Sequence, residues 1–210
     1  MGYTLTNLLN DRTLFLGTNN KKKITELESL LGPRGFKLRA PNHFPDALDV
    51  DETGTTFEEN ARIKAVAQAI HRRMWAIGED SGLCVPALRG EPGVYSARYS
   101  GSGATDASNN HLLLQRMEHV PENQRGAFYV STIALSDPDG MVHVETRGEC
   151  WGRVLRNPRG EGGFGYDPLF EIAEYHQTFA EMGAAVKHAI SHRARSLRAF
   201  LRILDNLVGS

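Results

Sequence analysis

Four short segments of this 210-residue chain carry residue types that could do chemistry. The first, residues 17–23, is a polar turn with three consecutive lysines between a predicted strand and a predicted helix. Backbone N–H groups at a helix start favour a phosphate, and neighbouring ammonium groups add to that preference. The segment is not a P-loop, because the pattern Gly-x-x-x-x-Gly-Lys-Ser/Thr is absent. An ordinary helix cap with solvated lysines is the alternative interpretation.

The second and third segments supply carboxylates. Asp51-Glu52-Thr53-Gly54 precedes a predicted helix on which Asn60 and Lys64, four residues apart, share a face. That face either extends an amide and an ammonium group toward an anion or is simply solvated. Glu79-Asp80-Ser81-Gly82 places two carboxylates at the end of a predicted buried strand, where they need water, a cation or another partner. Mg²⁺ takes one or two carboxylates plus substrate phosphates, which suits Glu52 and Asp80, and a polar β-turn is the alternative.

The fourth segment, residues 160–168, places Phe164 and Tyr166 among glycines. An aromatic side chain can stack on a flat ring, and glycines let the backbone approach that ring closely. A mobile surface loop is the alternative. Ser191-His192-Arg193 adds a cation-rich helix start, although a lone histidine is more often a cap or a packing residue. The set of segments indicates nucleotide hydrolysis or transfer, which no single segment establishes.

The hydrophobic pattern predicts the elements that must position these segments. Strands are expected at residues 13–17, 36–40 and 74–78, the last of them interrupted by residues 79–82. A helix is expected at residues 23–31, and a second one runs from the Thr56 and Glu59 capping box to residue 72. Asp106 is expected to cap a third helix. A final helix carries its apolar residues on one face, at Leu197, Phe200, Leu201 and Leu204.

The middle of the chain predicts a long hairpin. Asp137-Pro138-Asp139-Gly140 is a strong turn signal between two strand runs, residues 127–135 and 141–155. Residues 90–103 and 158–168 are expected to be loops, and the first eleven residues, which show no clear period, a short extension. Early alternation of helices and strands, followed by an antiparallel hairpin, predicts an α/β fold with a mixed sheet.

The composition excludes several classes of protein. The formal net charge is −1 and the sequence pI is about 6.7, so the overall field recruits neither nucleic acid nor an anionic membrane. No apolar run approaches the roughly 18 residues that a membrane span needs. Cys84 and Cys150 share no metal-ligand spacing and are expected to be buried thiols in a reducing compartment. With no signal-peptide pattern, the cytoplasm is the expected compartment.

Six motifs, in order along the chain, resemble one family. They are Thr18-x-Asn20-x-x-Lys23, Thr56-Phe57-x-Glu59-Asn60-Ala61-x-x-Lys64, Asp80-Ser81-Gly82-Leu83, Pro92-Gly93-Val94-Tyr95-Ser96-Ala97-Arg98-Tyr99, Gly163-Phe164-Gly165-Tyr166-Asp167-Pro168-x-Phe170 and Ser191-His192-Arg193. The family is that of the inosine triphosphate pyrophosphatases, and the resemblance covers residues 14–204. Asn19 stands where many members have glycine, and Ala185-Val186 replaces an acidic pair often found before Lys187.

The resemblance implies an α/β fold with a long twisted mixed sheet, flanking helices and two lobes around a central nucleotide-binding cleft. It places a single two-lobed domain at residues 13–207, after the extension at residues 1–12, and implies a homodimer. The implied reaction uses magnesium to hydrolyse inosine, deoxyinosine or xanthosine triphosphate (ITP, dITP, XTP) to the monophosphate and pyrophosphate. A non-hydrolysing nucleotide sensor and a phosphotransferase are the alternatives.

The resemblance also implies a role for each site residue. Asp80 accepts a proton from water that attacks the α-phosphorus, and it holds Mg²⁺ together with Glu52. Phe164 stacks on the purine. Donors from His192 or Arg193 favour the oxygen at position 6 of hypoxanthine or xanthine over the amino group of adenine. The implied substrate-binding residues are Thr18, Asn19, Asn20, Lys21, Lys22, Lys23, Lys64, Ser81, Phe164, Gly165, Tyr166, Asp167, Lys187, His192 and Arg193.

Overall fold

The computed structural model describes residues 3–44, 46 and 48–208 and divides into two compact units. Unit 1 comprises Met1–Asp80, Ser131–Gly148 and Ala194–Ser210, and unit 2 comprises Ser81–Val130 and Glu149–Arg193. Three strands contribute residues to both units, namely β3 (Ala76–Cys84), β4 (Gly126–Ser136) and β5 (Val142–Val154). Each unit is therefore built from discontinuous stretches of chain.

Among the described residues, seven strands form one sheet in the order β2-β1-β3-β4-β5-β6-β7. The remaining strands are β1 (Thr13–Leu16), β2 (Lys37–Arg39), β6 (Phe170–Ile172) and β7 (Gln177–Thr178). β1 pairs in parallel with β2 and β3, whereas β6 is antiparallel to β5 and β7. The predicted mixed sheet is confirmed.

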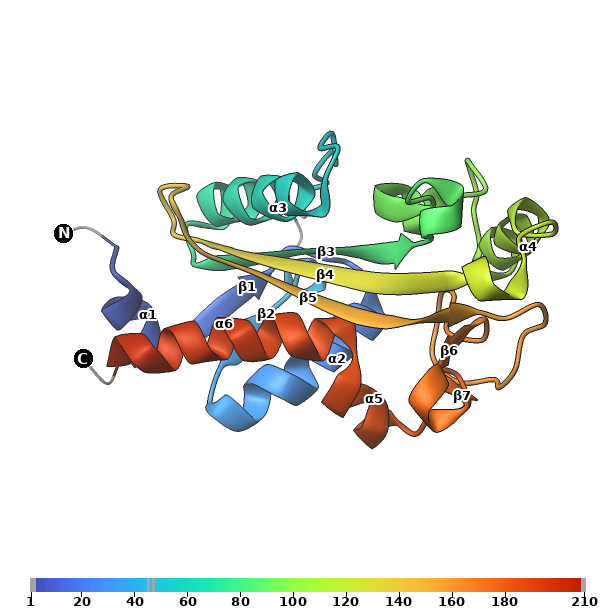
Figure 1. Ribbon diagram of the computed structural model, residues 1–210. Helices are drawn as coiled ribbons and strands as arrows, with labels where there is room; N and C mark the ends of the chain where they lie inside the picture. The colour runs from blue at the N-terminus through green and yellow to red at the C-terminus, as the bar shows by residue number, and fades with distance from the viewer. Residues whose placement is uncertain (1–2, 45, 47, 209–210) are drawn as a thin grey trace. The chain divides into compact units, whose positions relative to one another are not determined.

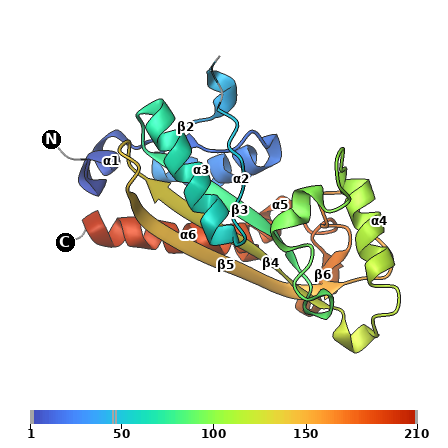
Figure 2. The ribbon, with the colours of Figure 1, turned by 90° about the horizontal axis from the view of Figure 1, so that it is seen from above.

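Helices cover both faces of the sheet in unit 1. α3 (Phe57–Arg72) lies on one face, and α2 (Lys21–Leu31) and α6 (His192–Val208) lie on the other (Figure 1, Figure 2). The predicted capping box of α3 is present, with the Thr56 hydroxyl accepting from Glu59 N and the Glu59 carboxylate accepting from Thr56 N. The predicted apolar face of α6 is buried in the core of unit 1 at Leu197, Phe200, Leu201 and Leu204.

The short extension is helical where the structure describes it. Thr4 caps α1 (Leu5–Asp11), and Leu8, only 1% exposed, packs into the core of unit 1. Met1 and Gly2 lie outside the described residues. This helix was not predicted, although Leu5, Leu8 and Leu9 have the spacing of a one-sided helical contact.

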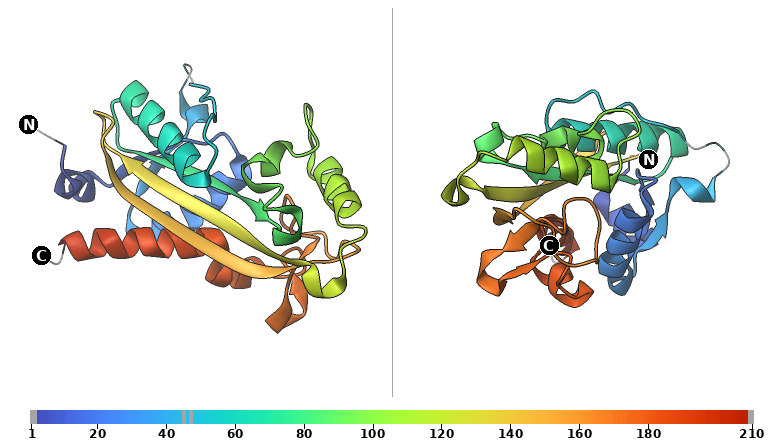
Figure 3. Two further views of the ribbon diagram at one scale, coloured as in Figure 1. Left: turned by 45° about the horizontal axis from the view of Figure 1, so that its top comes forward. Right: turned by 90° about the vertical axis from the view of Figure 1, so that its right-hand side faces the viewer.

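Unit 2 packs smaller elements around an aromatic core. α4 (Asp106–Arg116) lies on one side of the strands, and the chain that forms β6, β7 and α5 (Ala184–Ile190) lies on the other (Figure 1, Figure 3). The Tyr129 ring contacts Phe170 edge-on at 4.8 Å between ring centroids, and Phe179 packs against the same pair. Cys84 and Cys150 are buried thiols, as predicted.

The predicted hairpin is confirmed as β4, a tight turn and β5. Asp137 stabilises the turn, because its Oδ1 accepts from Asp139 N at 2.9 Å and from Met141 N at 3.0 Å. His143 Nε2 lies 2.7 Å from the other carboxylate oxygen of Asp137. None of the described helices has the length and apolar character needed to span a membrane.

Three expectations about local structure were wrong. Residues 79–82 do not interrupt a strand but lie inside β3, where lysines from neighbouring elements donate to the carboxylates of Glu79 and Asp80. Thr105, not Asp106, caps α4, because the Thr105 hydroxyl accepts from Ser108 N. The predicted loop at residues 90–103 contains a 3-10 helix, η4 (Gly93–Arg98).

Candidate active site

Close packing of α3 onto β3 sets the position of the polar residues in unit 1. Gly78 lies under the helix, and a Cβ at this position would come within 2.0 Å of Ala61 O and 2.5 Å of Ala65 N. Because the backbones approach so closely, side chains that leave α3 on this face reach β3 directly. Asn60 and Lys64 are buried on that face and contact Asp80, which lies two residues beyond Gly78.

Lys64 joins the two carboxylates of the predicted magnesium pair. Its Nζ lies 2.8 Å from Asp80 Oδ1 and 3.2 Å from Glu52 Oε1, while Asn60 Nδ2 lies 3.4 Å from Asp80 Oδ2. Burial raises the pKa of Asp80 above its usual range, although Lys64 and Lys23 lower it. Burial also lowers the pKa of Lys64, but the negative charges of Asp80 and Glu52 outweigh that effect and raise it.

Glu79 is a second buried carboxylate that sequence reasoning did not assign to the site. Neighbouring residues in a strand point to opposite faces, so Glu79 faces away from α3 while Asp80 faces toward it. Glu79 Oε2 lies 2.7 Å from Lys23 Nζ of α2, and Glu79 Oε1 accepts from the Ser131 hydroxyl at 3.1 Å. The sequence did contain a signal for Glu79, because it places two acids side by side. In the structure Glu79 pairs with Lys23 and Asp80 pairs with Lys64.

The predicted phosphate-binding turn is a genuine helix cap. Asn20 Oδ1 accepts from Lys22 N at 3.0 Å and from Lys23 N at 3.2 Å, and the Thr18 hydroxyl accepts from Asn20 N. Asn19, Lys21 and Lys22 are exposed. The helix cap is thus present, and the binding of phosphate by this segment stays a prediction.

The unit 1 cluster contains more carboxylates than ammonium groups. Three carboxylates, those of Glu52, Glu79 and Asp80, face two ammonium groups, so one negative charge is in excess. Within the described part of the chain, no group of three or more His, Cys, Asp or Glu side chains could hold a metal ion. Glu52 and Asp80 both lie within ion-pair distance of a single cationic atom, Lys64 Nζ, so the two carboxylates lie close together.

In unit 2 a buried carboxylate organises the glycine-rich loop. Asp167, 2% exposed, accepts from Phe164 N at 2.8 Å and from Lys187 Nζ at 2.6 Å. Gly163 has a φ of +75°, and a Cβ there would come within 2.1 Å of Asp167 Oδ2. Only glycine fits this position, because both its backbone conformation and the approach of the carboxylate exclude a side chain.

Cationic groups surround the ring of Phe164. Lys187 Nζ lies 4.8 Å and Arg193 Cζ 5.8 Å from the centre of the ring. Arg193 is 2% exposed and donates from Nη2 to the Ser81 hydroxyl at 3.2 Å. The His192 ring stacks on Tyr129 with centroids 4.6 Å apart. The structure thus places two of the predicted base-reading residues, Lys187 and Arg193, beside one partly buried aromatic ring, and His192 against Tyr129.

Tyr166 is the predicted substrate residue whose side chain points elsewhere. Its ring is 2% exposed in the core of unit 2, and its hydroxyl donates to Ser96 O at 2.8 Å. Burial raises the pKa of this phenol. A contact between Tyr166 and substrate would therefore come from the backbone, and the predicted roles of the other site residues stay predictions.

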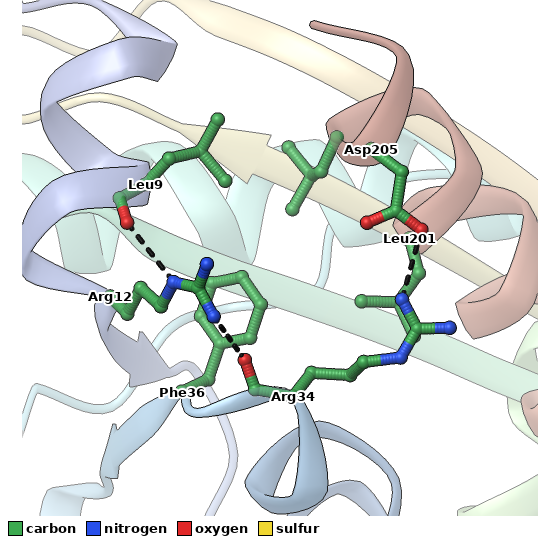
Figure 4. Close-up of a pocket in the computed structure, with 7 residues that line it drawn as sticks. Leu9, Arg12, Arg34, Phe36, Leu201 and Asp205 are labelled. Carbon is green, nitrogen blue, oxygen red and sulfur yellow. Dashed lines mark hydrogen bonds and ion pairs between the residues drawn. The ribbon is translucent and has the colours of Figure 1, made fainter. Parts of the chain in front are cut away.

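Unit 1 also contains a pocket of about 330 Å³ that no predicted site residue lines. Figure 4 shows its two arginines engaged, with Arg12 donating to the carbonyls of Leu9 and Arg34 and Arg34 paired with Asp205 at 2.9 Å. These bonds join the end of α1, residues 32–36 and α6. The pocket is therefore part of the packing between the chain ends.

Comparison with known proteins identifies the family. A model of the Ham1 family matches residues 14–203. A dITP/XTP pyrophosphatase from Rhodopirellula baltica is 49% identical over 197 residues, which cover 94% of this chain and 95% of that protein. A dITP/XTP pyrophosphatase from Desulforamulus reducens is 46% identical, over 92% of this chain and 96% of its own length.

Solved structures agree. A HAM1 protein from Coxiella burnetii has a TM-score of 0.84 at 35% identity, covering 94% of this chain and 99% of that one. The Staphylococcus aureus Ham1 protein has a TM-score of 0.82 at 34% identity, covering 92% and 98%. The resemblance inferred from six short motifs is confirmed over nearly the whole sequence, and the chain belongs to the Ham1 family.

Proposed function

We propose that this protein hydrolyses ITP, dITP and XTP to the nucleoside monophosphate and pyrophosphate and so removes them from the nucleotide pool. The observation that carries the proposal is the buried Asp80 carboxylate, held by Lys64 and Asn60 in a chain whose relatives are named dITP/XTP pyrophosphatases. The residues proposed to bind the triphosphate belong to unit 1, and most of those proposed to select the purine belong to unit 2.

Magnesium is the proposed cofactor. Glu52 and Asp80 would hold it, with substrate phosphates as the further ligands. When bound, it would neutralise phosphate charge and stabilise the departing pyrophosphate. The Glu52 and Asp80 carboxylates support this proposal, because a divalent cation would offset their repulsion of the phosphates.

The side chains of unit 1 then have separate tasks. Asp80 accepts the proton of the attacking water, which is a role that needs a carboxylate fixed in position. Lys64 and Asn60 fix it from the α3 side. Lys23 lies at the start of α2 beside the Asn20 cap, where an ammonium group and helix N–H groups suit phosphate oxygens. Thr18, Asn20 and Lys64 complete the proposed triphosphate contacts.

The side chains of unit 2 would select the base. Phe164 is partly buried, and its ring is the proposed stacking partner of the purine. Arg193 and His192 donors would reward the oxygen at position 6 of hypoxanthine and xanthine and would face the amino group of adenine unfavourably. Asp167 pairs with Lys187, so the ammonium group is held in place beside the ring.

Two further proposals concern assembly and compartment. We propose a homodimer, which is consistent with an exposed aromatic residue in unit 2: Trp151 is 58% exposed and stacks on the half-buried Phe128 with centroids 4.4 Å apart. Sedimentation of wild type and Trp151→Ser tests it.

We propose the cytoplasm as the compartment, because buried thiols such as Cys84 and Cys150 are typical of a reducing environment.

A substrate panel tests the proposed reaction. ITP, XTP, dITP, GTP, ATP and UTP are supplied with Mg²⁺ and no acceptor, and pyrophosphate and phosphate are measured separately. We expect ITP and XTP to give monophosphate and pyrophosphate in equal amounts, with ATP far slower and no turnover in EDTA. Tight binding without products would identify a nucleotide sensor, turnover only with an added acceptor a phosphotransferase, and accumulating diphosphate a stepwise phosphatase.

A further inference from the structure

Two side chains of α4, those of Asp106 and Asn110, contact the glycine-rich loop, and neither accepts the hydrogen bond that caps the helix. The helix is capped by Thr105, so Asp106 is not needed for that purpose. The Asp106 carboxylate instead accepts from Gly165 N through Oδ2 at 2.9 Å. One turn later, Asn110 Nδ2 donates to Gly165 O, also at 2.9 Å. Both polar backbone groups of a single loop residue are thus held by positions i and i+4 of one helix.

The helix that makes these bonds is itself firmly anchored in unit 2. Leu113 of α4 is fully buried in the core of this unit. Asn109, 4% exposed, accepts from Ser100 N at 2.8 Å and donates to Ala97 O at 3.2 Å. Asp106 lies in the first turn, where the helix dipole favours a carboxylate, so its charge is tolerated there at little cost. α4 is therefore a rigid support for the loop.

The loop residue that α4 holds lies next to Phe164. Asp167 fixes Phe164 N at 2.8 Å, and α4 fixes the Gly165 peptide that follows. The backbone on both sides of the Phe164 Cα is therefore held by side chains from outside the residue itself. A ring on a backbone fixed in this way loses little freedom when a flat ligand stacks on it, and such preorganisation lowers the cost of binding.

We propose that Asp106 and Asn110 are positioning residues for base recognition, which hold the Gly165 peptide and so fix the Phe164 ring against which the purine stacks. The inference rests on the proposed function, because it assumes that the purine binds at Phe164. On this proposal α4 contributes to the affinity for substrate and not to the chemical step at the phosphates.

Four variants test the role of α4. Asp106→Ala removes a charge-assisted hydrogen bond and should raise KM for ITP about tenfold, with kcat changed less than about threefold. Asp106→Asn retains an acceptor oxygen and should recover most of the affinity. Asn110→Ala removes a neutral hydrogen bond and should raise KM by about three- to fivefold. Asn110→Asp turns a carboxylate toward Gly165 O and should raise KM further. His111→Ala, exposed on the same helix, is the control.

Product inhibition separates positioning from a general loss of structure. In Asp106→Ala, inhibition by inosine monophosphate should weaken about tenfold, while inhibition by pyrophosphate, which has no base, should stay unchanged. Equal weakening of both inhibitors, or a kcat that falls with an unchanged KM, would overturn the proposal. Thermal unfolding of each variant is compared with that of His111→Ala. If Asp106→Ala does not fold, Asn110→Ala and Asn110→Asp carry the same comparison.

A double-mutant cycle separates this inference from the proposed function. Phe164→Ala alone should raise KM for ITP, and Asp106→Ala should then add nothing, because the ring it positions is gone. Independent, multiplying effects of the two changes would contradict positioning through Phe164. If Phe164→Ala leaves KM unchanged, the proposed stacking itself fails. If Phe164→Ala raises KM while Asp106→Ala and Asn110→Ala do not, only the role of α4 fails.

Discussion

The two units hold their site residues by different physical means. In unit 1 the carboxylates and lysines are on regular elements, and their positions follow from the close approach of α3 to β3 at Gly78. In unit 2 the corresponding residues surround a loop, which hydrogen bonds from Asp167, Asp106 and Asn110 hold in shape. Backbone packing thus fixes the proposed chemistry, and side-chain hydrogen bonds fix the proposed base recognition.

This difference predicts how each half responds to substitution. Lys23 and Lys64 each pair with a buried carboxylate of the unit 1 cluster, so removing either lysine leaves that carboxylate without its ion pair. Changes in unit 1 should therefore act mainly on kcat or on folding. Changes in unit 2 should act mainly on KM and on the choice of purine.

The largest effect is expected from Asp80→Asn. Loss of a positioned base typically removes about 10² to 10⁴ in rate, and weakened metal binding adds to this. The variant should fold and still bind ITP, as measured by calorimetry in Mg²⁺. Asp139→Asn, an exposed acid in the hairpin turn, is the control and should keep wild-type activity. More than a tenth of the wild-type kcat in Asp80→Asn would remove it as the base.

Arg193→Ala should change selectivity more than rate. Its guanidinium is buried in the first turn of α6, where the helix dipole disfavours a cation, and it is held near Phe164. The ratio of kcat/KM for ITP over ATP should shrink by about one to two orders of magnitude. Arg195→Ala, exposed two residues along, is the matched control. An unchanged ratio with both constants lowered equally would assign Arg193 to phosphate binding instead.

Gly78→Ala tests whether packing sets the unit 1 geometry. The added methyl group would meet Ala61 O at 2.0 Å and must push α3 away from β3. Overpacking of this kind lowers the free energy of unfolding by about 1–3 kcal/mol, and kcat should fall because Lys64 and Asn60 move with the helix. Gly32→Ala, where a Cβ meets nothing within 4 Å, should be nearly neutral in urea unfolding. Equal stability of the two variants would argue against the packing account.

The smallest effect concerns the acid stability of unit 2. Burial would raise the pKa of Glu171, but hydrogen bonds and charges from Arg153 and Arg159 outweigh it and lower the pKa. A lowered pKa in the folded state stabilises the protein above the unfolded value, about 4.3, and this contribution is lost as pH falls through the folded value. Glu171→Gln should therefore be less stable than wild type at pH 7.

Urea unfolding at pH 7, 5, 4 and 3 measures this dependence. The difference between wild type and Glu171→Gln should shrink steadily below pH 5, as the wild-type carboxylate takes up a proton. Glu118→Gln, an exposed acid on the same unit, should show little difference at any pH. A gap between wild type and Glu171→Gln that is constant from pH 7 to 3 would contradict the ion-pair explanation.

The sequence predicted elements whose signals are local. The capping box at Thr56 and Glu59 and the turn signal at residues 137–140 are complete within a few residues, and both were predicted correctly. β3 was cut short because Glu-Asp-Ser-Gly is typical of a turn. The reason it is a strand lies far away in sequence, at Lys23, Lys64 and Ser131, and no local pattern contains it.

The candidate site shows the same limit. The motifs indicated Asp80, Lys64, Asp167 and Lys187 as site residues. Only the fold shows that Asp80 pairs with Lys64 and that Asp167 pairs with Lys187. The local sequence pattern predicted that Asp106 caps the helix, but in the structure its neighbour Thr105 has this role. A polar residue at a helix start has several possible partners, and only the tertiary structure shows that Gly165 is the one it holds.

Hydrolysis of ITP in water enriched in ¹⁸O tests the central claim most directly. If Asp80 activates a water that attacks the α-phosphorus, the bond to pyrophosphate breaks and the label enters inosine monophosphate. Mass spectrometry of the separated products should then find one ¹⁸O per monophosphate and none in pyrophosphate. Label in pyrophosphate would place the attack at the β-phosphorus, and label in free phosphate would show stepwise release, and either result would contradict the account.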